Sequence, residues 1–104
     1  MDNYEIQITE PAENDLRAIG VYISKELLEL SIAKNIIAKI GQAIMKLEEL
    51  PLRNALILDG EIALQGIRKI LVDNYIVFYN VIEENKTVTI IRILYNRRDW
   101  INLL

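Results

Sequence analysis

The apolar pattern of this chain changes period near residue 66, and this change constrains the fold more than any other feature. Between residues 10 and 50 the apolar side chains recur every three or four positions, which predicts helix. From residue 67 to residue 95 they gather in β-branched and aromatic runs, which favour strands. A short alternating run at residues 4–8 predicts one earlier strand. This order predicts an α+β fold, β-α-α-β-β-β, in a single domain over residues 1–104.

Capping residues set the expected bounds of two helices. Thr9 is a good N-cap, so the first helix is expected over about 10–28. Ser31 resembles a second N-cap, and the second helix is expected to end near residue 50 because Pro51 disfavours helix in the residue before it. The expected connection between the two helices is only two or three residues long, so they should form an antiparallel hairpin. We expect this hairpin to pack on one face of a small antiparallel sheet.

Three strands are expected in the second half of the chain, at Ile67–Val72, Tyr75–Ile82 and Thr87–Tyr95. Short turns separate them, so they form an antiparallel meander that the first strand completes. Residues 52–65 are less readable: Asp59-Gly60 is a turn signal, and the segment is either a small hairpin or a loop with one docked end.

The expected strands are apolar on both faces. In the middle strand Tyr75, Val77, Tyr79 and Val81 face one way and Ile76, Phe78 and Ile82 the other; in the last strand Val88 and Ile90 oppose Ile91 and Ile93. Two helices cover only one face of a small sheet, so the second apolar face needs a cover. We expect the tail after residue 96 to supply part of it and a partner chain the rest. Ile76, Phe78 and Ile91 are therefore the predicted partner-binding residues.

Composition excludes several kinds of chemistry. The chain has no cysteine and no histidine, which removes disulfides, thiolate sites and histidine-based catalysis. No cofactor and no metal are expected. The net charge of −3 argues against strong nonspecific binding to nucleic acid. The chain shows neither a signal peptide nor a membrane-spanning apolar run, so we expect a cytoplasmic protein without a membrane partner.

Basic side chains gather on the meander and at its exit. They are Arg68, Lys69, Arg92, Arg97 and Arg98. Such a cluster either holds phosphate or an acidic partner, or consists of solvated positions and ion pairs with Asp73 or Asp99. Tyr95 either acts as an acid, a base or a stacking surface, or packs on the rim, and Trp100 either contacts a target or anchors the tail. The carboxylates of Asp15, Glu48 and Glu49 are expected on solvated helix faces.

The order of these motifs resembles the RelE/ParE superfamily of bacterial toxins from type II toxin–antitoxin modules. The resemblance rests on residues 8–16, Gly66–Ile70, Asn74–Val81 and Ile93–Trp100, and covers nearly the whole chain apart from residues 52–65. It implies a growth-inhibiting toxin that a cognate antitoxin neutralises. It also implies one of two activities, since RelE-type members cut mRNA in the ribosomal A site and ParE-type members inhibit DNA gyrase.

Carried over residue by residue, the match to the nuclease branch is partial. Lys69 falls on a basic position of the RelE active-site strand, Arg98 falls on the basic position after the last strand, and Tyr95 stands where many relatives have histidine. These three are the catalytic residues if the chain is a nuclease. Two further basic positions of that set are Ile67 and Ile76 here, which leaves open whether the chain is an enzyme.

Three functions follow from these observations. The missing basic groups and the acidic chain favour ParE-like inhibition of DNA gyrase by binding. The first alternative is RelE-like cleavage of mRNA on the ribosome, and the second is a non-toxic structural module that forms a homodimer through its apolar sheet face. The predicted target-binding residues are Arg68, Arg92, Arg97, Arg98 and Trp100.

Overall fold

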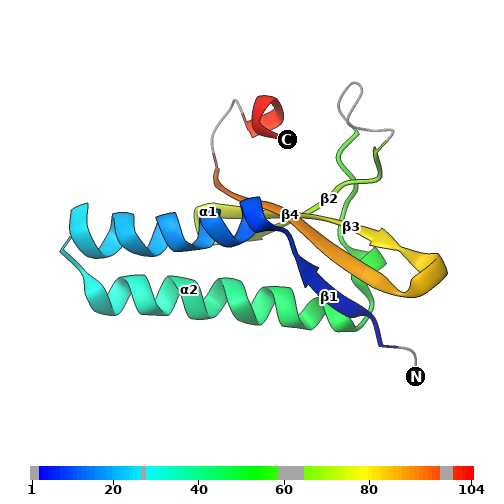
Figure 1. Cartoon of the computed structure of the whole chain (residues 1–104), viewed down its shortest axis with the longest axis horizontal. Coiled ribbons are helices and arrows are strands. Elements are labelled where there is room, and N and C mark those ends of the chain that lie inside the picture. Colours follow the sequence, from blue (N-terminus) through cyan, green and yellow to red (C-terminus); the bar gives the residue numbers. More distant parts are fainter. Residues whose placement is uncertain (1–2, 27, 59–64, 97–99) are drawn as a thin grey trace.

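The computed structural model describes residues 3–26, 28–58, 65–96 and 100–104, and shows a helical hairpin packed on one face of a four-stranded sheet (Figure 1). The strands are β1 (Glu5–Ile8), β2 (Arg68–Val72), β3 (Tyr75–Ile82) and β4 (Thr87–Tyr95). Their order in the sheet is β1-β4-β3-β2. The predicted α+β class and the predicted element order are confirmed.

The first helix is shorter than its periodicity predicts. α1 spans Glu10–Val21, and Thr9 caps it by accepting a hydrogen bond from the N–H of Ala12. The chain then continues as one π-helical turn, η1 (Tyr22–Glu26), instead of α-helix to residue 28. The wider i→i+5 turn ends the regular helix before the hairpin connection.

The second helix, α2, spans Leu30–Met45, and its N-cap is Glu29 rather than the predicted Ser31. The 3-10 turn η2 (Lys46–Glu48) follows it directly, so the predicted end near residue 50 lies close to the end of this turn. Within the described part of the chain, none of the helices has the length and apolar character that crossing a membrane requires.

The sheet is mixed rather than wholly antiparallel. β1 pairs in parallel with β4, from Glu5 opposite Thr87 to Ile8 opposite Ile90. A parallel neighbour needs a long crossover, and here the helical hairpin and the first two strands of the meander supply it. β2, β3 and β4 form the predicted antiparallel meander.

A β-bulge in β4 decides which of its side chains face the helices. Phe78 pairs with Arg92 while Tyr79 pairs with Ile90, so Ile91 is an extra residue between them. Ile90 and Ile93 consequently lie in the same core cluster, under the helices. The prediction that Ile90 and Ile93 oppose each other is wrong, because strict alternation does not hold across a bulge.

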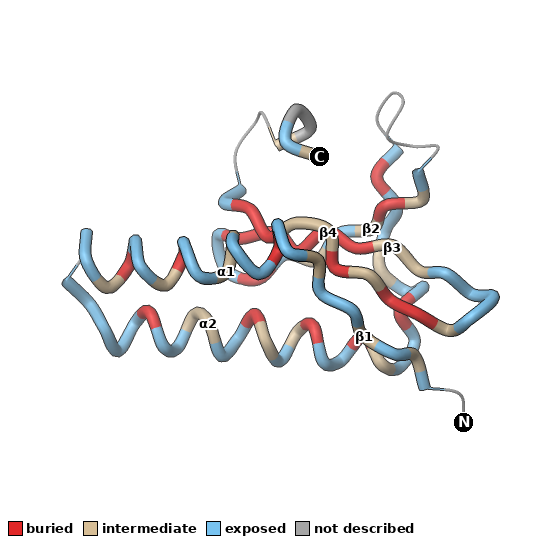
Figure 2. The backbone as a smooth tube through the Cα atoms, in the orientation of Figure 1, coloured by how far each residue is buried: buried red, intermediate tan, exposed pale blue. Residues whose placement is uncertain are grey.

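The sheet separates two hydrophobic clusters. Buried residues occur along the helices and along the strands (Figure 2). The larger cluster lies between the helices and the sheet and includes Ile40, Val77 and Tyr79, each fully buried. The smaller cluster lies on the opposite face and contains Ile57, Ile67, Ile76, Phe78 and Leu94. Figure 1 shows the C-terminal turn η6 (Trp100–Leu103) on this side, across the sheet from α2.

The segment before β2 docks at the outer edge of the sheet. A 3-10 turn, η3 (Pro51–Arg53), leads to an isolated bridge between Leu56 and Arg68. The N–H of Ile57 donates to the carbonyl of Ile67 (2.9 Å). Residues 55–57 therefore run antiparallel beside the start of β2, while the predicted turn at Asp59-Gly60 lies outside the described residues.

Candidate functional site

Two of the predicted catalytic residues lie on opposite faces of the sheet. Lys69 pairs with Phe78 on the face that η6 covers, and its ammonium lies 5.5 Å from the ring centroid of Trp100. Tyr95 pairs with Tyr75 on the helix face, where the two rings meet edge to face with centroids 5.5 Å apart. The sheet therefore keeps Lys69 and Tyr95 from sharing one reacting centre. Arg97 and Arg98 lie outside the described residues.

Arg68, a predicted target-binding residue, is committed to the backbone of the preceding segment. Its guanidinium donates to the carbonyls of Leu52 (3.0 Å) and Asn54 (2.6 Å). Beside it the buried hydroxyl of Tyr79 donates to the carbonyl of Pro51 (2.6 Å) and accepts from the amide of Asn54 (3.0 Å). These bonds hold the 51–54 segment against the sheet, so Arg68 has a structural task.

Arg92, a second predicted target-binding residue, is held by a carboxylate on α1. Its Nε donates to Oδ2 of Asp15 (2.7 Å) and its Nη2 to Oδ1 (2.8 Å), while Nη1 donates to the carbonyl of Leu103 (3.0 Å). Hydrogen bonding to Asp15 raises the pKa of Arg92. One guanidinium thus ties together the first helix, the last strand and the C-terminal turn.

Asp15 was expected on a solvated helix face, and that expectation is wrong. Only 13% of its side chain is exposed, and it also accepts a hydrogen bond from the N–H of Ile93 (2.9 Å). Asp15 thereby gives a hydrogen-bond acceptor to a backbone N–H of β4 that lies beyond the last residue paired with β1. The predicted ion-pair partners of the basic cluster were Asp73 and Asp99, yet Asp73 pairs with Lys39 (3.2 Å).

The face predicted to await a partner is already covered within the chain. Ile76 and Phe78 are 4% and 0% exposed, and Ile91 is half-buried. Trp100 packs on Phe78 with ring centroids 5.1 Å apart. It therefore anchors the tail on the sheet, which was one of the two roles predicted for it. The other covering side chains are Ile57, Ile67 and Leu104. A partner would reach Ile76 or Phe78 only by displacing this cover.

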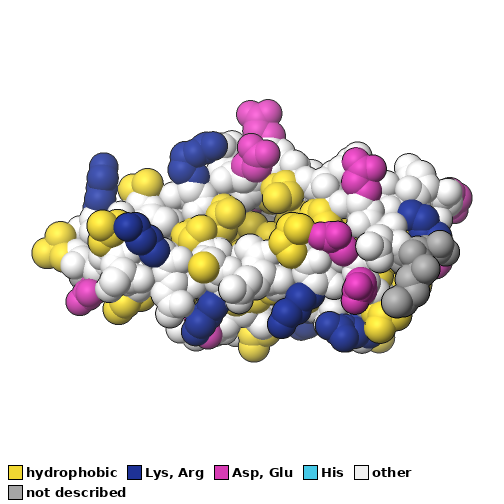
Figure 3. Space-filling model, turned by 90° about the horizontal axis from the view of Figure 1, so that it is seen from below, with side chains coloured by type: hydrophobic (Ala, Val, Ile, Leu, Met, Phe, Trp, Pro, Cys, Tyr) yellow, Lys and Arg dark blue, Asp and Glu magenta, His cyan; other side chains and the backbone are white. Residues whose placement is uncertain are grey.

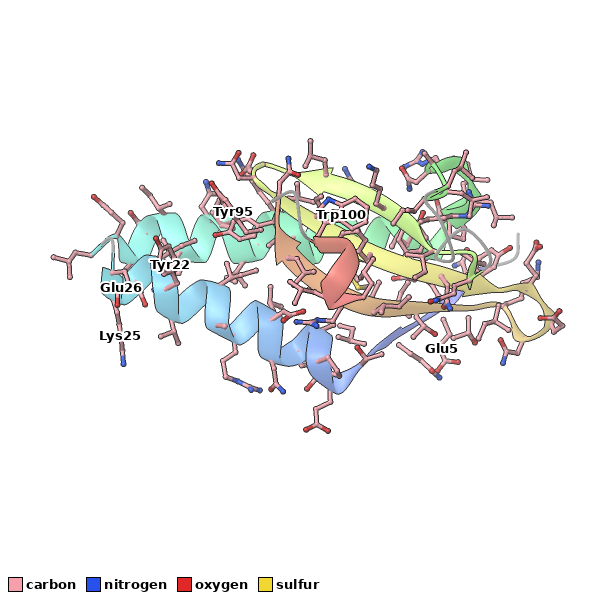
Figure 4. The ribbon with its side chains drawn as sticks, turned by 90° about the horizontal axis from the view of Figure 1, so that it is seen from above. Glu5, Tyr22, Lys25, Glu26, Tyr95 and Trp100 are labelled. Atoms are coloured by element: carbon pink, nitrogen blue, oxygen red, sulfur yellow. The ribbon has the colours of Figure 1, made fainter. Side chains whose placement is uncertain are left out.

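A groove with three tyrosines, which sequence reasoning missed, lies at the other end of the sheet. It has a volume of about 590 Å³ and lies between α1, η1, the start of α2, the start of β3 and the end of β4. Tyr22, Tyr75 and Tyr95 line it, and Figure 4 shows Tyr22 and Tyr95 near one another there. Burial, and then the nearby Tyr95 and Tyr22, raise the pKa of Tyr75. The three tyrosines come from three separate elements, η1, β3 and β4, so their spacing in the sequence does not predict the groove.

Comparisons with known proteins agree with this architecture. Residues 6–100 match the family model of the ParE toxin of the type II toxin-antitoxin system parDE. No curated protein matches the sequence significantly.

Three solved structures illustrate the likeness in fold. The chromosomal ParDE toxin-antitoxin system from P. aeruginosa is similar with a TM-score of 0.75 and 18% identity, over 93% of this chain and 100% of that one. The RelBE2 toxin-antitoxin complex from Mycobacterium tuberculosis gives 0.68 and 23%, over 89% and 98%. A mutant of E. coli toxin RelE in the free state gives 0.69 and 18%, over 97% and 92%.

Proposed function

We propose that this chain, which belongs to the ParE toxin family of type II toxin–antitoxin systems, arrests growth by binding DNA gyrase and does not cut RNA. The family match confirms the RelE/ParE membership predicted from the order of the motifs. Membership makes the chain the toxin component of such a module. The choice of gyrase over ribosome-bound mRNA is the proposal.

The observation that carries the proposal is the environment of Ile67 and Ile76. The resemblance places basic groups of the RelE nuclease at these positions, whereas here they are apolar and 2% and 4% exposed. Both pack in the cluster under η6. Electrostatic stabilisation of a reacting phosphate needs charged donors around it, and these two positions supply packing instead.

The remaining basic side chains support the same choice. Arg92 donates through all three of its nitrogens to oxygens within the chain, and Arg68 donates through Nη1 to two backbone carbonyls. Neither side chain can turn toward a reacting phosphate without breaking those bonds. Lys69 is exposed but separated by the sheet from Tyr95. A site that binds a protein target needs no such convergence of catalytic groups.

We further propose that a cognate antitoxin neutralises the chain. The ParDE system and the RelBE2 complex among the similar structures are toxin-antitoxin assemblies, which supports a partner of this class. We expect a neighbouring reading frame to encode this antitoxin.

The test is induced expression in bacteria, with growth, plasmid supercoiling and mRNA integrity followed in the same culture. We expect growth arrest, relaxed plasmid DNA and intact mRNA, and we expect the purified chain to inhibit supercoiling by gyrase in vitro. Cuts in mRNA that require the ribosome, with supercoiling unchanged, would establish the RelE-like alternative. The cognate antitoxin, co-expressed, should restore growth.

A further inference from the structure

We propose that the tip of the helical hairpin is a self-association surface, through which two copies of this chain form a two-fold dimer. The tip is the part of the hairpin that projects past the end of the sheet (Figure 1). The proposal concerns the surface of this chain alone and does not depend on which target the toxin binds.

The first observation is a gathering of exposed apolar side chains at this tip. The described residues there include five large apolar side chains that are exposed: Val21, Tyr22, Leu28, Leu30 and Ile32. We call these five residues the hairpin-tip patch. Figure 3 shows hydrophobic side chains, with charged ones among them, at the left-hand end of the molecule, where the hairpin ends. Single exposed apolar residues are normal, whereas a gathering of them marks an interaction surface.

The patch continues into the groove with three tyrosines. Tyr22 and Ile32 belong to both, and Ile36 carries the apolar lining inward toward Tyr95. Figure 4 shows Tyr22 on the projecting hairpin and Tyr95 at the end of the sheet. The chain therefore presents a protruding element, around Leu28, beside a hollow one. Because both lie on one continuous surface, a two-fold axis can place the tip of each copy in the groove of the other.

The backbone of Leu28 is the second observation. Its φ is +53°, in the left-handed region that glycine and asparagine adopt most readily, and its side chain is 83% exposed. In a single copy, a leucine at this position carries backbone strain and gains no burial. Burial of the side chain against a second copy offsets both costs. A leucine here therefore suits an interface better than a solvated turn.

Charge favours a second copy over a strongly charged partner. The described residues that line the groove include no lysine and no arginine, and the carboxylate of Asp15 is already paired within the chain. Residues 21–34 carry two basic and two acidic side chains, Lys25 and Lys34 against Glu26 and Glu29. Two such tips meet without net repulsion, while an acidic peptide or a nucleic acid gains no electrostatic attraction here.

The test is analytical ultracentrifugation of the full-length chain over a range of concentrations. We expect the dimer to form at about 10–100 μM, as an interface of modest area gives. Amides of the hairpin tip should exchange more slowly as the concentration rises. Leu28→Asn removes the apolar side chain and places at this φ a residue that tolerates it, so the urea midpoint of the monomer should not fall. The dissociation constant of the dimer should rise about tenfold or more.

Leu50→Asn is the matched control. Leu50 has a φ of +52° and is 70% exposed, but it follows the opposite end of α2 and lies outside both the patch and the groove. The same substitution at this position should change the dissociation constant less than about twofold.

A second pair of variants tests the patch by charge. Ile32→Lys brings two like charges toward one another in a two-fold dimer and should raise the dissociation constant about tenfold or more. Met45→Lys adds the same charge at another exposed position, the last residue of α2, and should change the constant less than about twofold.

The outcomes decide the proposal. A parent chain that stays monomeric at about 100 μM would overturn it, and so would equal dissociation constants for the patch variants and their controls. Tip amides that are protected only after the antitoxin is added would assign the surface to that partner and would also overturn the dimer. Inhibition of gyrase is measured separately, so failure of the dimer leaves the proposed function standing.

Discussion

Asp15 on α1 and Arg92 on β4 form a two-point ion pair, with both carboxylate oxygens within 2.8 Å of the guanidinium nitrogens. The two residues are 77 positions apart in sequence. The pair joins the helical hairpin to β4, one of the two inner strands of the sheet, and Arg92 also reaches the C-terminal turn through the carbonyl of Leu103. This relationship turns a predicted target-binding arginine into a structural one.

Asp15→Ala should destabilise the chain by about 2–3 kcal/mol, because it leaves a largely buried guanidinium and the N–H of Ile93 without their acceptor. The measurement is the urea midpoint with the slope of the transition checked for constancy. Glu13→Ala, an exposed change on the same helix, is the control and should stay within about 0.5 kcal/mol. A loss as small as the control's would show that the pair contributes little.

The free energy of unfolding should fall at alkaline pH, because the pKa of buried Tyr79 is raised. Burial raises its pKa, against the smaller opposing effects of the Asn54 hydrogen bond and of Arg68, and burial also raises the pKa of Tyr75. Between the ordinary tyrosine pKa of about 10 and the raised folded value, the unfolded chain loses protons that the folded chain keeps. The contribution of these two tyrosines to the free energy of unfolding is therefore complete below about pH 10. It is lost as the pH rises through their folded pKa values.

The check is urea unfolding at several pH values from 8 upward, beside spectrophotometric titration of the tyrosines. Tyr79→Phe should weaken the alkaline dependence and, at neutral pH, cost about 1–2 kcal/mol because the Pro51 carbonyl loses its buried donor. A Tyr79→Phe chain with the parent's full alkaline dependence would assign that dependence to other groups.

The strands were predictable because their signal is local. Runs such as Tyr75–Ile82 are β-branched and aromatic and are bounded by short turns, and the observed β3 and β4 have the predicted bounds. The apolar second face was also predictable, and so was the anchoring of the tail by Trp100 as one of two alternatives. The parallel pairing of β1 with β4 depends on how the helical hairpin and the meander place these two strands side by side. A local sequence pattern does not predict that arrangement.

The site was less predictable, because it depends on which distant residues meet. A single aspartate among the polar positions of a helix is typical of a solvated surface. No pattern in the sequence around Asp15 predicts its ion pair with Arg92, 77 positions away. The bulge at Ile91 reverses the facing of the residues beyond it, so strict alternation assigned Ile93 to the wrong face. The separation of Lys69 from Tyr95 likewise needs the sheet register.

Phe78 is predicted to be a core residue of the second face. Phe78→Ala should cost about 3–4 kcal/mol, because Phe78 is fully buried in the second-face cluster and its ring packs against Trp100. Trp100→Ala should cost less, since Trp100 is only half-buried, and should increase binding of a hydrophobic dye by uncovering Phe78. Thermal unfolding and dye fluorescence measure both effects. A Phe78→Ala chain as stable as the parent would mean that this face is open in solution.

The basic exit of the meander is the remaining predicted target contact. Arg97→Ala combined with Arg98→Ala should relieve growth arrest, because two cations would be lost from the surface proposed to meet the target. Protein levels of the variant and the parent chain are compared by immunoblot in the same culture. Unchanged growth arrest at equal protein level would remove both arginines from the target site.

Tyr95 separates the two proposed mechanisms most cleanly. Tyr95→Phe removes a hydroxyl and keeps the ring that packs edge to face on Tyr75, so stability should change by less than about 1 kcal/mol. If the chain acts by binding gyrase, the hydroxyl transfers no proton, and growth arrest should persist together with relaxed plasmid DNA. If Tyr95 were the acid or base of an RNA cleavage, its loss should slow cleavage about a hundredfold or more and restore growth. Restored growth with the variant folded and expressed at the parent level would therefore favour the nuclease and overturn the gyrase proposal.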